Sequence, residues 1–331
     1  MPRKFTRRAV TTGALATFGL AATTRVSAQA WPARPIRFVV PFPAGNAGDI
    51  TARLISTRLS EKLGTSIVVE NRAGASGLIG TQSVKASEPD GYTFLVTSLS
   101  PMVVMPATRA DLPYEPQKDF SAVALVGRTA MALVSSKSLS GQTVKDVLAD
   151  VKASPGKYNY GHIGTGSLSH LSMALMIRAA GLEMTAVPYK GSGEVMTELI
   201  AGRIHLMWDG MTSSLPQVQA GTVRGLAVNS GTRSSLAPDL PTLRESNVPV
   251  SHDIDAWTGV LAPRGTPAEI IEKMNAEIGL IIKDAAFKEK ARALFLDPYE
   301  PASPTYFQDY LRTELDKWVA VYKAAGIQTV R

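Results

Sequence analysis

Two glycine-rich loops carry the residue types in this chain that best suit binding of a small anion. The first, Pro41-Phe42-Pro43-Ala44-Gly45-Asn46-Ala47-Gly48-Asp49, follows the apolar run Ile36–Val40. We expect a buried strand, a tight loop and then a helix that begins near Asp49. The backbone N–H groups and the positive dipole end of a helix N-terminus favour a bound anion. Because this loop contains no Lys, Arg, His, Ser or Cys, it predicts binding by the backbone with little chemistry on the ligand.

The second loop reads Gly161-His162-Ile163-Gly164-Thr165-Gly166-Ser167-Leu168-Ser169-His170. Its three glycines permit close approach, Thr165 and Ser167 offer hydroxyl groups, and a helix is expected to start around Ser167. These features suit a carboxylate held by N–H and hydroxyl donors. A Ser-capped helix after a flexible loop explains the same residues. Since two such loops occur, one in each half of the chain, we favour the binding site.

His170 lies on the first turn of that predicted helix, where it could donate to an anion or only support the loop. Ser167 or Ser169 paired with His170 is the one arrangement that could serve a hydrolase. Residues that share a helix turn rarely reach attack geometry, so the hydrolase is the lesser alternative. The chain contains no Gly-x-Ser-x-Gly elbow, P-loop or complete dinucleotide fingerprint.

Three further polar residues have two interpretations each. Asp49 could cap its helix, and could also orient the first loop. Lys190, in Tyr189-Lys190-Gly191-Ser192-Gly193, could place a cation at the edge of a cleft or simply be solvated. Asp209 follows the apolar run 206–208, where a polar residue is either a ligand contact or a turn former. If Asp209 faces a cleft, it requires a hydroxyl, ammonium or water donor.

Composition excludes several other classes of protein. The chain has no Cys, which rules out disulfides and thiolate chemistry, and its His, Asp and Glu residues show no metal-ligand spacing. We therefore expect no metal and no cofactor. Five of the 35 Lys and Arg residues, and none of the 28 acidic ones, lie in residues 1–30, so the rest of the chain carries 30 against 28. This near balance gives no reason to expect a nucleic-acid partner.

Residues 1–30 have the layout of an export signal. Arg3, Lys4, Arg7 and Arg8 precede a mildly apolar stretch, and small residues allow cleavage after Ala28 or Ala30. Thr6-Arg7-Arg8 resembles a twin-arginine signal, whereas Val10-Thr11-Thr12 departs from one, so both the twin-arginine and the general route stay open. A cytoplasmic protein with a basic frayed end is the alternative.

Strands and helices alternate along the rest of the chain. The predicted strands cover 36–40, 67–70, 92–97, 158–161, 185–187, 206–208, 223–228 and 256–261, with a long extended apolar segment at 121–135. The predicted helices cover 49–63, 77–86, 143–153, 167–180, 193–201, 215–220, 267–282, 285–294 and 304–325. This alternation favours parallel sheets with helices on both faces. Two such series joined by an apolar crossover predict an α/β protein of two lobes, with a ligand cleft at the carboxyl ends of the strands.

Short motifs in chain order point to a known family. They include Trp31-Pro32-Ala33-Arg34-Pro35-Ile36, Val39-Val40-Pro41-Phe42-Pro43-Ala44-Gly45, Val69-Glu70-Asn71-Arg72-Ala73-Gly74-Ala75-Ser76-Gly77, Pro89-Asp90-Gly91-Tyr92-Thr93, Gly164-Thr165-Gly166-Ser167, Val187-Pro188-Tyr189-Lys190-Gly191 and Ala262-Pro263-Arg264-Gly265-Thr266-Pro267. The chain resembles the Bug family, the extracytoplasmic solute-binding receptors of tripartite tricarboxylate transporters. The resemblance covers nearly all of the chain after residue 30.

The resemblance implies a two-lobed periplasmic binding protein of type II, with each lobe a sheet flanked by helices. Lobe 1 would comprise residues 31–131 plus 254–331, and lobe 2 residues 132–253. Such a receptor closes on a small carboxylate and delivers it to an integral membrane permease. It implies a periplasmic monomer without enzymatic activity. A ligand-sensing subunit that docks a membrane sensor is the alternative of another class.

The resemblance also implies which residues contact the ligand. One carboxylate would be held by Phe42, Ala44, Gly45, Asp49, Gly164, Thr165, Gly166, Ser167 and His170. Ser98 and Asp209 stand where the family varies its distal contacts. Asn46 replaces the usual Gly or Ser, and His162 replaces the usual Ser, so the pocket of this chain is expected to differ in shape.

Overall fold

The computed structural model describes residues 1–2, 31–248, 254 and 256–325. The chain divides into two units, Met1–Ala30 and Trp31–Arg331, and the described helices and strands all belong to the second. The predicted export signal, apart from Met1 and Pro2, lies outside the described residues. Within the described part, no helix is both long and apolar enough to cross a membrane.

A six-stranded sheet is built from the two ends of the second unit, in the order β11-β4-β10-β3-β1-β2. Its strands are β1 (Ile36–Val40), β2 (Ile67–Asn71), β3 (Thr93–Ser98), β4 (Phe120–Thr129), β10 (Ala256–Pro263) and β11 (Asp297–Pro298). β1 runs parallel to β2 and β3, whereas β10 is antiparallel to β3 and β4. The prediction of a parallel sheet is wrong here. β4 leads the chain toward a second sheet and β10 brings it back, so these neighbours must run in opposite directions.

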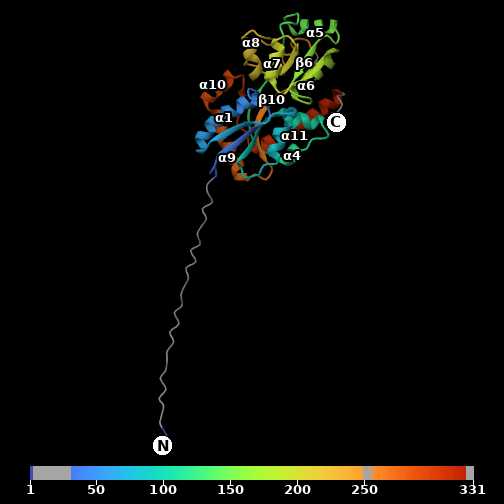
Figure 1. Ribbon diagram of the computed structural model, residues 1–331. Helices are drawn as coiled ribbons and strands as arrows, with labels where there is room; N and C mark the ends of the chain where they lie inside the picture. Colours follow the sequence, from blue (N-terminus) through green and yellow to red (C-terminus); the bar gives the residue numbers. More distant parts are fainter. Residues whose placement is uncertain (3–30, 249–253, 255, 326–331) are drawn as a thin grey trace. The chain divides into compact units, whose positions relative to one another are not determined.

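Helices cover both faces of this first sheet. They are α1 (Ala47–Leu63), α2 (Leu78–Lys85), α3 (Met105–Thr108), α4 (Pro116–Asp119), α9 (Ala268–Lys283), α10 (Ala285–Ala293) and α11 (Pro304–Ala325), with a 3₁₀ turn at Ala75–Gly77 and a π-helix at Ser100–Val104. Alternate strand residues enter different cores: Phe38 packs in the cluster that holds Ile55 of α1, and Val39 in the cluster that holds Leu311 of α11. Helix α1, near the blue start of the chain, therefore lies beside α9 from its red end (Figure 1).

The second sheet has the order β7-β6-β8-β5-β9. Its strands are β5 (Met131–Ser135), β6 (Asn159–His162), β7 (Thr185–Pro188), β8 (Leu206–Gly210) and β9 (Arg224–Val228), and its helices are α5 (Val144–Ala153), α6 (Leu168–Ala180), α7 (Ser192–Ile200) and α8 (Met211–Gln219). β6 is parallel to β7 and β8, and β5 is antiparallel to β8 and β9. This sheet is mixed as well.

The extended segment predicted at 121–135 is two strands in two different sheets. β4 ends at Thr129 in the first sheet and β5 begins at Met131 in the second, so Ala130 alone separates them. The helix predicted at 215–220 begins earlier, at Met211, because Pro216 is tolerated inside α8. These connections bring the carboxyl ends of β3 and β8 and the N-termini of α1, α6 and α8 to the same cavity.

Candidate functional site

A cavity of about 70 Å³ lies between elements of the two sheets. Its lining residues are Asn46, Ala47, Gly48, Ser98, Leu99, Ser100, Thr129, Met131, Ile163, Leu168, Ser169, Asp209, Gly210, Ser213, Ala256, Trp257 and Thr258. They come from the ends of β3, β8 and β10 and from the starts of α1, α6 and α8. Asp209 is the only charged side chain among them. We call this space the central cavity.

Three helix N-termini meet at the central cavity. α1 contributes Ala47 and Gly48, α6 contributes Leu168 and Ser169, and α8 begins next to Gly210. First-turn amides have no partner within their own helix, and the helix dipole is positive at this end. The walls of the cavity are therefore suited to a carboxylate even though none of the described residues that line it is basic.

The first loop is shaped by Asn46 and Gly45. The side chain of Asn46 accepts a hydrogen bond from the Gly48 N–H at 2.7 Å and is the N-cap of α1. Gly45 has a φ of 82°, a left-handed conformation that favours glycine. The prediction that Asp49 caps the helix is wrong. The helix begins at Ala47, because Asn46 is itself a strong capping residue.

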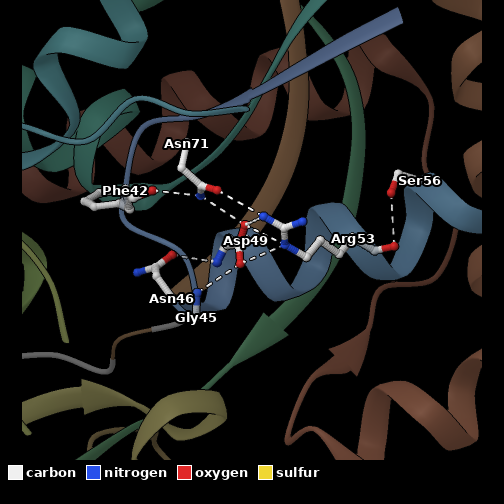
Figure 2. Close-up of polar contacts among 8 residues, drawn as sticks. Phe42, Gly45, Asn46, Asp49, Arg53, Ser56 and Asn71 are labelled. Atoms are coloured by element: carbon white, nitrogen blue, oxygen red, sulfur yellow. Dashed lines mark hydrogen bonds and ion pairs between the residues drawn. The ribbon is translucent and has the colours of Figure 1, made fainter. Parts of the chain in front are cut away.

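Asp49 is buried at the first turn of α1 and is surrounded by donors (Figure 2). Its carboxylate accepts hydrogen bonds from Gly45 N–H at 2.9 Å, Arg53 Nε at 3.0 Å and Asn71 Nδ2 at 3.0 Å. Burial raises the pKa of Asp49, but the bonds from Arg53, Gly45 and Asn71 outweigh it and hold the pKa below the ordinary value. Asn71 also donates to the carbonyl of Phe42 at 3.0 Å. This network fixes the backbone of the first loop.

The second loop is held by neutral groups. Ser167 caps α6 by accepting the His170 N–H at 3.3 Å, and its hydroxyl lies 3.1 Å from that of Ser169. The Ser169 hydroxyl accepts the Ile163 N–H at 3.1 Å, and His170 Nδ1 accepts the Gly166 N–H at 3.2 Å. The prediction of a Ser-capped helix at this point is confirmed.

Two histidines pack together beneath the second loop. The rings of His162 and His170 lie 4.4 Å apart, and Tyr160 stacks on His170. Burial, together with the charge of His162, lowers the pKa of His170 to about 4, and burial also lowers the pKa of His162. Both rings are therefore neutral at pH 7 and supply no cation for a carboxylate.

The same hydrogen bonds argue against a hydrolase. Because Nδ1 of His170 accepts a bond from Gly166, the neutral ring must carry its proton on Nε2. The ring then has no free lone pair with which to act as a general base for Ser167 or Ser169. Both hydroxyls instead accept backbone N–H groups, Ser167 from His170 and Ser169 from Ile163.

Loops of the two sheets contact each other directly beside the cavity. The hydroxyl of Ser76 donates to the carbonyl of Thr165 at 2.9 Å, and the hydroxyl of Ser100 accepts the Leu168 N–H at 2.9 Å. A Cβ placed on Gly164 would lie 2.2 Å from the Ser76 hydroxyl. Gly164 thus permits an approach that any larger residue would prevent.

Asp209 is the penultimate residue of β8 and is buried, with 3% of its surface exposed. Its two oxygens accept hydrogen bonds from Ser192 Oγ at 2.7 Å and Ser213 Oγ at 2.6 Å. Burial raises the pKa of Asp209 despite these two bonds. Asp209 and Ser213 also line a second cavity of about 390 Å³, which is bounded by Ala44, Gly45 and residues of α7 and α8.

The predicted contact residues separate into three groups. Ser98 and Asp209 line the central cavity, whereas Ala44 and Gly45 line the second one. The remainder are not among the lining residues of either cavity: Phe42, Asp49, Gly164, Thr165, Gly166, Ser167 and His170. They lie in the two loops and set the position of the helix starts.

Several lining residues were absent from the prediction. Ser100 lies two residues from the predicted contact Ser98, and Ser169, which the sequence indicates only as a hydrolase serine, is next to the predicted contact His170. Trp257 and Thr258 lie on β10, and no local motif marks them. Among the described residues, no group of three or more His, Asp or Glu side chains could hold a metal ion.

Two sheets with helix N-termini at a cavity between them form an arrangement suited to holding a small anion. The model of the "Tripartite tricarboxylate transporter family receptor" family matches residues 51–327. BugT of Bordetella pertussis is 34% identical over 313 residues, which cover 94% of this chain and 95% of BugT. The chain belongs to this receptor family, in agreement with the resemblance to Bug proteins.

Solved structures extend the likeness to three dimensions. A protein of R. palustris with adipate is 36% identical with a TM-score of 0.87, over 91% of this chain and all of that one. MatC from Rhodopseudomonas palustris with bound malate is 30% identical with a TM-score of 0.83, over 88% of this chain and 99% of that one. The fold prediction is confirmed.

Proposed function

We propose that this protein captures a small carboxylate in the central cavity and delivers it unchanged to a membrane permease. The observation that carries the proposal is the meeting of three helix N-termini in a space without a basic side chain, nucleophile–base pair or metal cluster among the described residues. Such walls bind an anion reversibly, since backbone amides grip without reacting. The adipate and malate held by related structures support a carboxylate as the ligand.

We propose that residues 31–131 with 254–331 form one lobe and residues 132–253 the other. The first sheet takes its strands from both ends of the second unit, and the second sheet from the middle. Ala130, between β4 and β5, is then a crossing point where a hinge motion would occur. The ligand would shift an existing equilibrium between open and closed forms.

Within this site, the two loops act mainly by placing backbone amides. Asp49, with Phe42 and Gly45, fixes the start of α1, while Ser167, His170 and Gly166 fix the start of α6. Gly164 and Thr165 contact Ser76 in the closed form, in which the Ser76 hydroxyl donates to the Thr165 carbonyl. Ser98 and Asp209 face the ligand.

Family membership supports function outside the cytoplasm. We propose export of residues 31–331 through the signal at residues 1–30 by the twin-arginine or the general route, and action as a periplasmic monomer. Uptake of the ligand by cells that carry the permease, and its loss when this receptor is deleted, would support transport. Normal uptake with loss of a ligand response would instead identify a sensing subunit.

Ligand binding can be tested on protein purified from the periplasm and then unfolded and refolded to remove bound solutes. Thermal-shift screening against mono- and dicarboxylates should find a stabilising ligand, because a ligand that binds only the native state raises its stability. Calorimetry would give its affinity, and chromatography should recover it unchanged. Absence of any stabilising carboxylate, or chemical conversion of the ligand, would contradict the proposal.

A pair of glycine variants tests the approach of the two loops. In Gly164→Ala the new Cβ would collide with Ser76, whereas in Gly166→Ala its nearest neighbour is Thr108 Oγ1 at 3.8 Å. Both glycines have positive φ, 106° and 79°, so the second variant controls for backbone strain. We expect Gly164→Ala to weaken binding at least tenfold more than Gly166→Ala. Equal losses in the two variants would contradict the closed contact at Ser76.

A further inference from the structure

Asp209 occupies an unusual place in the wall of the site. Of the described residues that line the central or the second cavity, it is the only one with an ionisable side chain, and it lines both. It lies at the end of β8, immediately before the start of α8. Among the described residues that line the central cavity, a ligand therefore meets one acidic group and no basic side chain.

The hydrogen bonds of Asp209 define what it can still bind. Each of its oxygens accepts one hydroxyl, from Ser192 and from Ser213, and the carboxylate also accepts the backbone N–H of Gly210, so three acceptor positions are used. A carboxylate offers about four acceptor positions, so acceptor capacity remains. The hydroxyl protons of Ser192 and Ser213 are spent on Asp209 and cannot be donated to a ligand at the same time. This part of the wall therefore presents hydrogen-bond acceptors.

An ionised carboxylate on the ligand fits poorly against such a wall. It would place a second negative charge beside Asp209 with no cationic side chain among the described lining residues, and like charges in a partly dry site repel strongly. A hydroxyl or ammonium group would instead donate to a free position of Asp209. Because the N–H groups of Gly48 and Leu168 already donate to Asn46 and Ser100, the amides of Ala47 and Ser169 are the ones that would receive the ligand's carboxylate.

We propose that Asp209 recognises a hydrogen-bond donor on the ligand, and that the preferred ligand is a hydroxy- or amino-substituted monocarboxylate. Its carboxylate lies at the first-turn amides of α1 and α6, and its hydroxyl or ammonium group at Asp209. This inference rests on the proposed function, because it requires a carboxylate in the central cavity. It distinguishes the chain from a receptor for simple dicarboxylates.

The test is calorimetric titration of the refolded periplasmic protein with ligands of matched length. Each set contains a monocarboxylate, its terminal hydroxy and amino derivatives, and the dicarboxylate, for chains of four and six carbons. We expect the hydroxy or amino member to bind at least tenfold more tightly than the dicarboxylate. The ranking of the hydroxy and amino members identifies which donor is read.

Asp209→Asn should lower the ratio of the affinity for the hydroxy or amino member to that for the dicarboxylate at least tenfold. The reason is that the amide presents a donor to the second carboxylate. Asp239→Asn, an exposed substitution of the same kind, should leave the preference unchanged. A dicarboxylate that binds wild type most tightly would overturn the inference while leaving the proposed function intact. Failure of every carboxylate to bind would overturn the function itself. Should Asp209→Asn not fold, the wild-type ratio alone decides.

Discussion

Asp49 and Asp209 are buried to the same extent, each 3% exposed, yet their surroundings are opposite. Asp49 is bonded by a guanidinium, an amide and a backbone N–H, and it is not among the residues lining the two cavities. Asp209 is bonded by two neutral hydroxyls and lines both cavities. The pKa of the first is lowered and that of the second is raised by burial.

The difference teaches how burial alone misleads about function. A buried carboxylate whose charge is compensated by Arg53 stabilises the loop that it joins. A buried carboxyl group without a cationic partner has a raised pKa and unused acceptor capacity, and a group of this kind in a cavity wall is a candidate for ligand contact. The comparison assigns a structural role to Asp49 and a recognition role to Asp209.

The largest effect is expected from Asp49→Ala. It would leave Asn71 and the Gly45 N–H without their acceptor and should lower the free energy of unfolding by roughly 3 kcal/mol. Denaturant unfolding followed by circular dichroism measures this. Asp309→Ala removes a mostly exposed ion pair with Arg312 and is the control, with little loss expected. A loss no greater than that of the control would contradict the structural role of Asp49.

The next prediction uses pH to separate the two carboxyl groups. The lowered pKa of Asp49 means that its stabilisation is present above the unfolded pKa of 3.8 and is lost as pH falls through the folded value. The raised pKa of Asp209 means that stability is favoured below 3.8 and is lost as pH rises toward the folded value. Asp49→Asn should therefore lower the free energy of unfolding most at neutral pH. The free energy of unfolding of Asp209→Asn should increase relative to that of wild type as pH rises.

Thermal unfolding of the two variants and wild type between pH 3 and pH 7 tests these opposite slopes. If the stability differences between each variant and wild type changed with pH in the same direction, the opposite roles of Asp49 and Asp209 would be contradicted.

The smallest predicted effect concerns His170, which supports the second loop without a charge. The unfolded chain takes up its proton near pH 6.5, but the folded pKa is about 4, so stability falls as pH drops between these values. His170→Asn keeps an acceptor for Gly166 and should reduce this loss by roughly 1 kcal/mol, given that the ring is partly solvated. Melting temperatures measured from pH 7 to pH 4 provide the check, and identical acid slopes would refute it.

Much of the fold could be predicted from local patterns. The apolar runs at 36–40 and 206–208 predicted strands that the structure contains, and Gly64 predicted the end of α1. These predictions were possible because burial and capping act locally. Strand direction could not be predicted in this way, since alternating or continuous apolar residues do not show which way a strand runs. The antiparallel insertion of β10 between β3 and β4 is therefore visible only in three dimensions.

The candidate site could be predicted only in part, because its lining also depends on how the strands pair. Ser98 and Asp209 follow apolar runs, and their place at strand ends could be predicted. Trp257 and Thr258 reach the cavity only because β10 pairs with β3 and β4. Sequence also could not distinguish Asp49 from Asp209, because their roles depend on Arg53, Ser192 and Ser213 as neighbours in space.

A crystal structure of the refolded protein with its tightest-binding carboxylate tests the central claim most directly. We predict a ligand carboxylate within about 3 Å of the Ala47 and Ser169 amides, a ligand donor at Asp209, and no ligand contact to the carboxylate of Asp49. A ligand bound by the Asp49–Arg53 pair, with Asp209 left untouched, would contradict the account.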